Sequence, residues 1–402
     1  MLKMEREKTR VLCIDHEGGR GGSSKSLYES LNVVDRDRID VAVWCRQESH
    51  LIKAYENLGI GTKIVPDWPR FTPLDRLLPS ILALAVSGFR FARFFIKRRG
   101  MLSKLKQEFD VIHLNHENLF PLAWLIHRFS GLPISMHIRT IQFDTKLSRW
   151  QTNWISQLAD FLFFISVNEQ RTFHARMGRA SAQSVLTNIV NSEPDLSTPL
   201  KVPHEDCLLV ASIGNFSLEN GTDRLIDLSF QLKERGRNDI HFIVAGQMEL
   251  PPRMRRSLPP EARFARTLPE YANALGLADY FSFVGHVSNT RRILDAAQIG
   301  IKLNRLGSNW GRDVLEALGA GVPILAVGKD ETFVRPNETG LLFKNYHPEQ
   351  ICDALVNLRD KNSDLEALRQ SAVSAAQVII DPSAHGKLLT DRWEWMHRNR
   401  RD

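Results

Sequence analysis

The first half of the chain alternates short apolar runs with amphipathic stretches. The runs are rich in Val, Ile, Leu and Phe and lie at residues 11–15, 41–46, 60–65, 110–114, 133–138 and 161–167. Stretches between them, such as 26–34 and 51–58, have apolar residues at helical spacing. Continuous apolar runs that alternate with helices are typical of parallel strands buried on both faces. We therefore expect a first α/β domain over residues 1–195.

A second series of apolar runs begins at 208–214. It continues at 241–246, 281–284, 299–303 and 323–327, and an amphipathic stretch at 222–235 separates its first two members. Between the two series, residues 191–206 contain three prolines and few apolar residues, as an interdomain linker does. The pattern predicts two tandem Rossmann-like α/β domains, the second over residues 196–384, that face each other across a cleft.

Composition agrees with this prediction. The chain has 402 residues, 43% of them hydrophobic and 25% charged, which excludes a disordered or fibrous protein and suffices for two domains. Its four cysteines lie far apart, so we expect neither a zinc site nor a redox pair. The charged first ten residues do not resemble a secretory signal, and we expect a cytoplasmic protein with free thiols.

The net charge of +7 is concentrated in one segment of the chain. Residues 1–200 contain 27 basic and 20 acidic side chains, whereas residues 201–402 contain 26 of each. Residues 68–106 alone carry nine basic side chains and one acid. No recognisable nucleic-acid-binding module accompanies this basic segment, so we expect no nucleic-acid partner.

Within the basic segment, residues 77–89 form the longest apolar stretch of the chain. At 13 residues this stretch is too short to cross a bilayer, and basic residues interleaved with phenylalanines follow it directly. Apolar residues beside a basic face are typical of a helix that lies on an anionic membrane. The alternative is a core helix that packs its Leu and Phe side chains on the sheet. We expect residues 77–106 to associate peripherally with the inner face of a membrane.

A glycine-rich loop follows the first predicted strand. Gly19, Arg20, Gly21 and Gly22 precede a predicted helix, and a loop in that position can bind a phosphate with its backbone N–H groups. The Walker and the dinucleotide-binding fingerprints both fail at Ser24. The loop therefore indicates an anion site, with a purely structural turn as the alternative.

Histidines lie near the ends of two neighbouring predicted strands. His113 lies in the fourth strand and His116 two residues after its end, and His137 lies in the fifth strand, two residues before Arg139. In a cleft, such a histidine contacts a sugar hydroxyl or a reacting carbonyl, and the alternative is a hydrogen-bonded structural histidine. Because no acid or cysteine accompanies them at ligand spacing, we expect no metal site.

The most informative segment covers residues 303–343. It contains the run Ser308-Asn309-Trp310-Gly311-Arg312-Asp313-Val314-Leu315-Glu316-Ala317 and, shortly after, Gly319-Ala320-Gly321-Val322-Pro323. A loop with Gly311 at the start of a helix places backbone donors and Arg312 where an anion binds. Glu316 lies one turn further along and is within reach of a ribose or sugar hydroxyl beside that anion.

This segment resembles the nucleotide-sugar site of the retaining GT-B glycosyltransferases of family 4, the glycosyl transferases group 1. Their pattern is Glu-Gly-Phe-Gly, four residues, Glu-Ala, and then Gly-x-Pro, in which Glu316 matches the second glutamate and Ser308 replaces the first. Other similar segments, in the family's order, extend over almost the whole chain. They are residues 18–22, 110–116, 133–137, 186–191 and 210–227.

The resemblance implies a role for each matching residue. The nucleotide-sugar donor would lie on the second domain and the acceptor on the first, where a helix over residues 385–402 would pack back. His137 would touch the transferred sugar, Arg312 the phosphates and Glu316 the ribose. The implied donor site comprises Asn215, Asn220, Lys302, Arg305, Ser308, Asn309, Trp310 and Gly311, the glycine-rich loop contributes Gly19, Arg20, Gly21 and Gly22, and the acceptor side contributes His116 and Arg139.

The chain departs from the family pattern at the donor diphosphate. Asn215 and Asn220 stand where the family usually has an Arg and a Lys, so we expect Lys302, Arg305 and Arg312 to supply the positive charge instead. The resemblance then implies a metal-independent hexosyltransferase that retains anomeric configuration and needs no cofactor beyond the nucleotide diphosphate-sugar co-substrate. Its acceptor would be a glycan or a lipid-linked glycan of polysaccharide biosynthesis. A degenerate, non-catalytic GT-B protein and a GT-B-like sugar-nucleotide epimerase are the alternatives.

Overall fold

The chain folds into two compact units that are not continuous in sequence. The computed structural model describes residues 7–18, 22–73, 77–140, 144–177, 182–190, 206–287, 289–305, 307 and 309–400, with the backbone alone at 77–80. One unit comprises residues 1–189 and 381–402, and the other comprises residues 190–380. We call them the N-terminal unit and the C-terminal unit. Most of the predicted linker, residues 191–205, lies outside the described residues.

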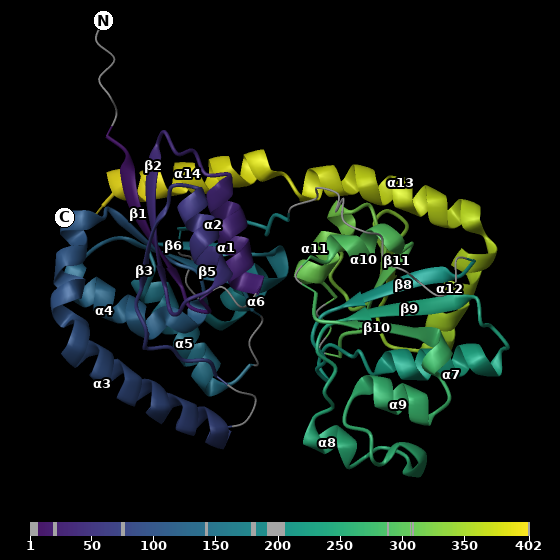
Figure 1. Cartoon of the computed structure of the whole chain (residues 1–402). Coiled ribbons are helices and arrows are strands. Elements are labelled where there is room, and N and C mark those ends of the chain that lie inside the picture. The colour runs from purple at the N-terminus through teal and green to yellow at the C-terminus, as the bar shows by residue number, and fades with distance from the viewer. Residues whose placement is uncertain are drawn as a thin grey trace, which may run out of the picture. The chain divides into compact units, whose positions relative to one another are not determined.

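The N-terminal unit is built on a seven-stranded parallel sheet (Figure 1). Its spatial order is β3-β2-β1-β4-β5-β6-β7, the Rossmann order extended by one strand. The strands are β1 (Thr9–Asp15), β2 (Ile39–Cys45), β3 (Gly61–Ile64), β4 (Val111–Leu114), β5 (Ile134–Ile138), β6 (Phe161–Phe164) and β7 (Ala182–Val185). The apolar runs predicted the first six of these strands, and β7 is an addition.

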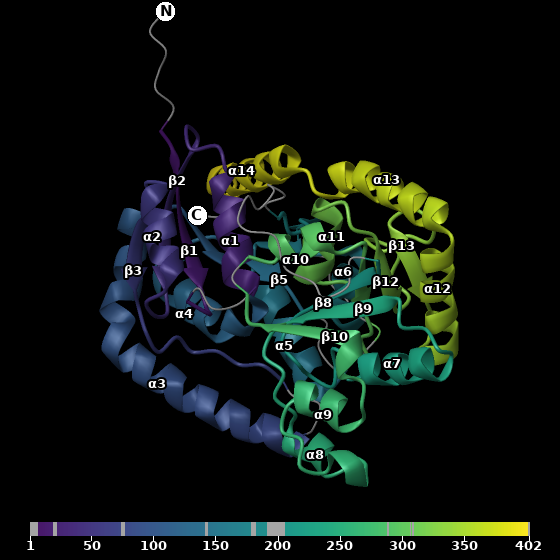
Figure 2. The same ribbon diagram turned by 45° about the vertical axis from the view of Figure 1, so that its right-hand side comes forward.

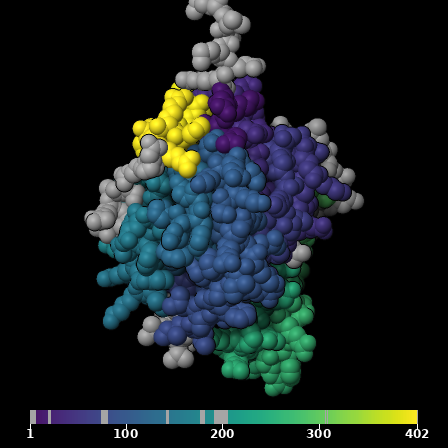
Figure 3. All heavy atoms as spheres, turned by 90° about the vertical axis from the view of Figure 1, so that its left-hand side faces the viewer, coloured from purple at the N-terminus to yellow at the C-terminus, as the bar shows by residue number. Residues whose placement is uncertain are grey.

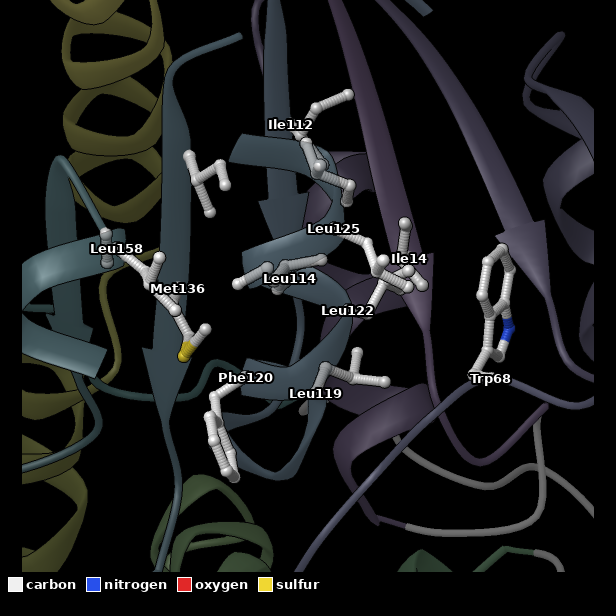
Figure 4. Close-up of a cluster of buried hydrophobic side chains, with 14 of the residues drawn as sticks. Ile14, Trp68, Ile112, Leu114, Leu119, Phe120, Leu122, Leu125, Met136 and Leu158 are labelled. Carbon is white, nitrogen blue, oxygen red and sulfur yellow. The ribbon is translucent and has the colours of Figure 1, made fainter. Parts of the chain in front are cut away.

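Helices cover both faces of this sheet. They are α1 (Gly22–Asn32), α2 (His50–Asn57), α3 (Leu77–Glu108), the short 3-10 turn η1 (Glu117–Leu119), α4 (Phe120–Ser130), α5 (Lys146–Leu158) and α6 (Val167–Met177). On one face, α3, α4 and α5 enclose a core in which Ile14, Leu114 and Leu122 point toward one another (Figure 4). On the other face, α1 and α2 pack with the last helix of the chain, α14 (Pro382–Arg398).

Helix α14 is an integral part of the N-terminal unit. Trp393 is fully buried, and its indole N–H donates to Ser135 Oγ at 3.2 Å. Arg38 forms ion pairs with Asp391 and Glu394 of the same helix, each at 2.8 Å. Gly386 lies so close to α1 that a Cβ at this position would overlap the Val33 carbonyl oxygen. Helix α14 therefore covers the middle of one face of the sheet and keeps solvent away from it.

Helix α3 is 32 residues long and extends well beyond the apolar stretch at residues 77–89. Phe94, Leu102 and Leu105 are buried in the core, whereas Leu82, Phe89 and Ile96 are exposed by 63%, 69% and 74%. No helix among the described residues is sufficiently long and apolar to span a bilayer. Part of α3 therefore packs on the sheet, as the core-helix alternative expects, and the association with a membrane stays a prediction.

The C-terminal unit has a six-stranded parallel sheet in the order β10-β9-β8-β11-β12-β13, again a Rossmann order (Figure 2). Its strands are β8 (Leu208–Ile213), β9 (Ile240–Ala245), β10 (Phe281–Gly285), β11 (Ile299–Lys302), β12 (Ile324–Val327) and β13 (Gly340–Phe343). The sequence predicted all but β13.

The helices of this unit are arranged on both faces of its sheet. They are α7 (Arg224–Glu234), α8 (Pro252–Arg255), η2 (Pro260–Ala262), α9 (Leu268–Ala274), η3 (Ala278–Tyr280), α10 (Arg291–Ala296), α11 (Arg312–Gly319), α12 (Pro348–Asp360) and α13 (Asn362–Ile379). Side chains of α7, α9 and α12 share one core with the sheet. Helix α11 packs against both α10 and α13.

Candidate functional site

In the C-terminal unit, the loops that follow β8 and β11 meet at the carboxyl edge of the sheet. These two strands are neighbours, and the strand order reverses between them, which is where Rossmann folds bind ligands. Arg305 joins the two loops, because its guanidinium contacts Asp223 at 2.6 and 2.7 Å and the Leu218 carbonyl at 2.7 Å. Gly221, with φ of 73°, is packed so tightly that a Cβ would overlap the Leu303 carbonyl. The two loops are thus held in one arrangement.

Helix α11 begins at this edge, directly after Gly311. Lys302 Nζ lies 2.6 and 2.8 Å from the two carboxylate oxygens of Asp313 in the first turn. A Cβ at Gly311 would come within 2.6 Å of Asp313 Oδ1, so only glycine leaves room for this ion pair. The helix start predicted from the sequence is confirmed. The N–H groups in the first turn of a helix favour an anion.

Glu316 is held on the first turns of α11 by two partners. Arg312 Nε donates to its Oε1 at 2.8 Å, and Thr290 Oγ1 donates to its Oε2 at 2.6 Å. The Arg312 and Glu316 side chains are only 14% and 10% exposed. A carboxylate has about four lone-pair positions and can accept hydrogen bonds from several donors, hydroxyl groups included.

Each of the three cations expected to hold the diphosphate has a carboxylate partner in this structure. The pairs are Lys302–Asp313, Arg305–Asp223 and Arg312–Glu316. The positive charge of the site is therefore largely balanced locally. The pairing of Arg305 with Asp223 could not be predicted from the sequence, because the two residues become neighbours only through the order of the strands.

The other predicted donor residues fall into three groups. Asn309 is fully buried and exchanges two hydrogen bonds with the Asp330 backbone at 2.6 and 3.1 Å, while Trp310 packs on Phe333 with ring centroids 4.8 Å apart. Asn215 and Asn220 are exposed, and the Asn220 side chain donates to the Asn215 carbonyl at 3.2 Å. Ser308 lies outside the described residues.

In the N-terminal unit, polar side chains gather at the carboxyl ends of β1 and β4. The rings of His16 and His116 are in contact at a tilt of 50°, with centroids 4.2 Å apart, and both are largely buried. Burial lowers the pKa of His16 to about 2 and that of His116 to about 3, so both rings are neutral at physiological pH. Within the described residues, no group of three or more His, Cys, Asp or Glu side chains is arranged to hold a metal ion.

Arg139 organises this edge from the end of β5. Its guanidinium donates to the Asn115 carbonyl at 2.7 Å, to Asn115 Oδ1 at 2.5 Å and to Asn188 Oδ1 at 2.9 Å. Its backbone N–H donates to Glu117 at 2.9 Å, and burial raises the pKa of that carboxyl group. His116 and Arg139, both predicted for the acceptor side, are thereby on the same edge of the sheet.

The side chain of His137 is buried more deeply than the predicted direct contact with a sugar would require. Its side chain is buried against Phe163 and His113, each with ring centroids 5.9 Å away, and burial holds its pKa well below the usual value. Arg139 Nη2 lies 3.3 Å from His137 Nδ1 and connects this ring to the sheet edge.

Of the glycine-rich loop, Gly19, Arg20 and Gly21 lie outside the described residues, and Gly22 begins α1. Next to the loop, Ser24 Oγ donates to the buried Asp15 at 2.7 Å, and Ser23 Oγ donates to Glu17 at 2.5 Å. Asp15, His16, Glu17 and Glu117 were not among the predicted site residues. Their signal was a polar run directly after an apolar strand, which marks a carboxyl edge.

Comparisons with known proteins agree with this geometry. The Anabaena protein Alr3699/HepE in complex with UDP and glucose superimposes with a TM-score of 0.74 at 16% identity, covering 96% of this chain and 100% of that chain. A glycosyltransferase from Rickettsia africae ESF-5 gives 0.71 at 12% identity, covering 98% and 100%. Sucrose-phosphate synthase from Thermosynechococcus elongatus gives 0.68 at 14% identity, covering 97% and 100%. The fold is GT-B.

The sequence comparison is confined to one part of this GT-B chain. Residues 208–361, which contain β8 to β13, match the family described as Glycosyl transferases group 1. No curated protein sequence matches the chain. The match therefore covers the unit that contains α11 and Glu316.

Proposed function

We propose that this protein is a glycosyltransferase that moves a hexose from a nucleoside diphosphate sugar to an acceptor hydroxyl. One observation carries the proposal: Glu316 and the start of α11 lie at the strand-order reversal of a unit that matches Glycosyl transferases group 1. The structural neighbour from Anabaena, which shares the fold, was solved with UDP and glucose. A donor of the same chemical kind suits an edge that offers helix N–H groups for phosphates and a carboxylate for ribose hydroxyls.

In this proposal the residues of the C-terminal unit hold the donor. Glu316 accepts hydrogen bonds from the ribose hydroxyls. The N-terminus of α11 and the Asn309–Arg312 loop face the diphosphate, and Lys302, Arg305 and Arg312 stabilise the negative charge that develops on it. To do so, each cation shares its charge between the phosphates and the acid that it contacts in this structure.

The reaction we propose retains anomeric configuration. The bond from the sugar's anomeric carbon to the donor phosphate breaks, and a bond to the acceptor oxygen forms on the same face of the sugar. The departing phosphate takes the proton of the acceptor hydroxyl, so the protein needs no separate base. His137 and Arg139 of the N-terminal unit contact the transferred sugar and the acceptor, without a metal ion.

A second function is favoured by a separate observation. The local balance of charge at Lys302, Arg305 and Arg312 reduces the stabilisation of the negative charge that develops on a departing diphosphate, relative to unpaired cations. A GT-B protein that binds a nucleotide sugar without turning it over fits that balance. Detecting a glycosylated product, or free UDP or GDP released only when acceptor is present, separates the two functions.

Binding of the donor is tested by thermal stabilisation with a panel of UDP- and GDP-sugars at millimolar concentration. We expect at least one to raise the unfolding temperature of the parent protein. Glu316→Gln should lower the affinity for that nucleotide sugar by about tenfold or more, because hydrogen bonds to a charged group contribute about 1.5–3 kcal/mol. The matched control is Glu338→Gln, another glutamate paired with an arginine in the same unit, at 2.9 Å from Arg335. No stabilisation by any nucleotide sugar, or equal affinity in the Glu316 variant, contradicts the proposal.

The acceptor is proposed to be a glycan or a lipid-linked glycan on the N-terminal unit, with α3 on the anionic inner face of a membrane. The exposed Leu82, Phe89 and Ile96 side chains and the basic residues of the same helix support this orientation.

A further inference from the structure

A groove on the N-terminal unit separates the outer face of α3 from the chain that precedes this helix. It has a volume of about 390 Å³, within the range of small-molecule sites. The side of the unit that carries α3 faces the viewer in Figure 3. The groove is lined by Arg70, Phe71, Thr72, Leu82, Ala83, Val86, Arg90 and Asn118.

One wall of the groove is apolar, and among the described residues little covers it. Leu82 and Val86, one turn apart on α3, are exposed by 63% and 50%. Ser87 and Phe94 face the opposite way and are buried. An exposed apolar strip of this kind costs solubility, and it indicates a surface that an apolar ligand covers.

The other end of the groove is polar and cationic. Asn118 is 7% exposed, and its Oδ1 is buried with no hydrogen-bond partner among the described residues. A buried amide oxygen without a hydrogen-bond partner is unfavourable, and a donor such as a ligand hydroxyl would satisfy it. Arg70 and Arg90 line the same groove, and neither guanidinium forms an ion pair with a described residue.

The two arginines also repel each other. Burial lowers the pKa of Arg70, and the nearby charges of Arg46 and Arg90 lower it further. Cations that crowd together in this way gain when an anion binds between them, and guanidinium groups suit phosphate oxygens.

The polar end is rigid before any ligand binds. Phe71 N–H donates to the Asn118 carbonyl at 2.9 Å, and Gln151 Nε2 donates to the carbonyls of Phe71 and Glu117 at 3.3 and 3.1 Å. The Phe71 ring is buried between Phe120 and Trp150. The groove is therefore a formed site between η1 and α3.

We propose that this groove binds a phosphorylated lipid that carries the acceptor sugar. The sugar hydroxyl donates to Asn118 Oδ1, the phosphate lies between Arg70 and Arg90, and the hydrocarbon chain covers Leu82, Ala83 and Val86. Asn118 follows His116 by two residues, so the sugar lies toward the carboxyl edge of the sheet and the chain leads away from it along α3. The proposal rests on the glycosyltransferase function, for which it specifies the acceptor class.

The test measures flotation of the full-length protein with two kinds of vesicle. Phosphatidylcholine vesicles that contain a few mole per cent of a long-chain polyprenyl phosphate are compared with phosphatidylcholine vesicles that contain phosphatidylglycerol at the same total charge. The groove variant is Arg70→Ser/Arg90→Ser. The matched control is Lys97→Ser/Arg99→Ser, which removes two positive charges from exposed positions of α3 that do not line the groove.

We expect the groove variant to lose about tenfold or more of its affinity for the polyprenyl phosphate vesicles, and the control variant less than about threefold. On phosphatidylglycerol vesicles the two variants should lose similar amounts. If the groove variant lost the same affinity on both kinds of vesicle, the arginines would contribute only a general attraction to a charged surface. That result would overturn the groove as the binding site. Complete competition by a water-soluble sugar phosphate would overturn the lipid as occupant.

A second variant removes the apolar wall without touching the charges. Leu82→Ser/Val86→Ser changes two exposed side chains, so folding is unaffected, and it should weaken flotation on the polyprenyl phosphate vesicles. Unchanged flotation would overturn the proposed position of the lipid's hydrocarbon chain. Stabilisation by a nucleotide sugar must be the same in all these variants, and Glu316→Gln must float as the parent does. Failure of the groove and failure of the donor site are thus read out separately.

Discussion

His385 is buried in the first turn of α14, and each of its ring nitrogens has a partner. Nδ1 lies 2.8 Å from the Thr187 carbonyl, to which it must donate, and Nε2 lies 2.8 Å from Ser30 Oγ. Burial lowers the pKa of this ring to about 4. The folded N-terminal unit therefore holds His385 neutral.

This neutral histidine makes stability depend on pH in a defined direction. Its pKa is lower in the folded than in the unfolded state, so its contribution is complete above the unfolded pKa, about 6.5. As the pH falls from there to about 4, the unfolded state alone binds the proton and stability is lost. Replacing His385 with Gln should reduce the slope by up to about 1.4 kcal/mol per pH unit in that interval. Urea unfolding at several pH values measures the slope, and parallel slopes in variant and parent contradict the assignment.

The sequence predicted the residues at the start of α11 well, and their partners not at all. Gly311 and Glu316 are recognisable because local spacing places them at a helix start. The partner of Arg305 is 82 positions away, and its identity depends on β8 lying beside β11. The same holds for Asn118, which is a surface-like residue in sequence and a buried one beside the groove.

At the scale of elements, apolar continuity predicted the central strands and missed two at the sheet edges. Strand β7 reads Ala-Gln-Ser-Val and β13 reads Gly-Leu-Leu-Phe, and both are four residues long. An edge strand pairs on one side only and needs less apolar sequence than a central strand, which accounts for β7. Three of the four residues of β13 are apolar, so this reason does not apply to it. Helix α3, at Leu77–Glu108, agrees with the helical segment expected at residues 77–106, and Gly88 and Gly100 lie within it without ending it.

Two helical glycines should respond in opposite ways to alanine. At Gly386 of α14 a Cβ overlaps the Val33 carbonyl, so Gly386→Ala should destabilise the N-terminal unit by about 1–3 kcal/mol. At Gly100 of α3 nothing lies within 4 Å of the added Cβ, and Gly100→Ala should stabilise by about 0.5–1 kcal/mol through helix propensity. Chemical denaturation of both variants provides the comparison. Destabilisation by both, or by neither, would show that helix packing is not what selects glycine at 386.

At the scale of the whole molecule, the sequence predicted two Rossmann-like units and their order. The boundaries in the structure fall at residues 189/190 and 380/381, close to the expected 195 and 384. The sequence alone does not reveal which unit a terminal helix joins, because Leu389, Trp393 and Met396 would suit any apolar face. Only the resemblance to a family indicated its return to the first unit.

Stability should be separable between the two units through Trp393. Trp393→Ala empties a fully buried site in the N-terminal unit and should cost about 3–5 kcal/mol there. Hydrogen exchange followed by mass spectrometry should then accelerate by about a hundredfold or more in β1, β4 and β5, with no change in β8, β9 and β11. Trp395→Ala, at a side chain that is 41% exposed, is the control and should change exchange little. Equal acceleration in both units would contradict their independence.

The return of α14 to the first unit has a consequence for how the chain folds during its synthesis. Residues 1–189 leave the ribosome first, yet the helix that covers one face of their sheet is made only after all of residues 190–380. Until then Val11, Leu31 and Phe163 lack the cover that Trp393 and Leu389 give them. The unit translated second can thus reach its native state first. During translation, the unit that begins the chain depends longest on protection from aggregation.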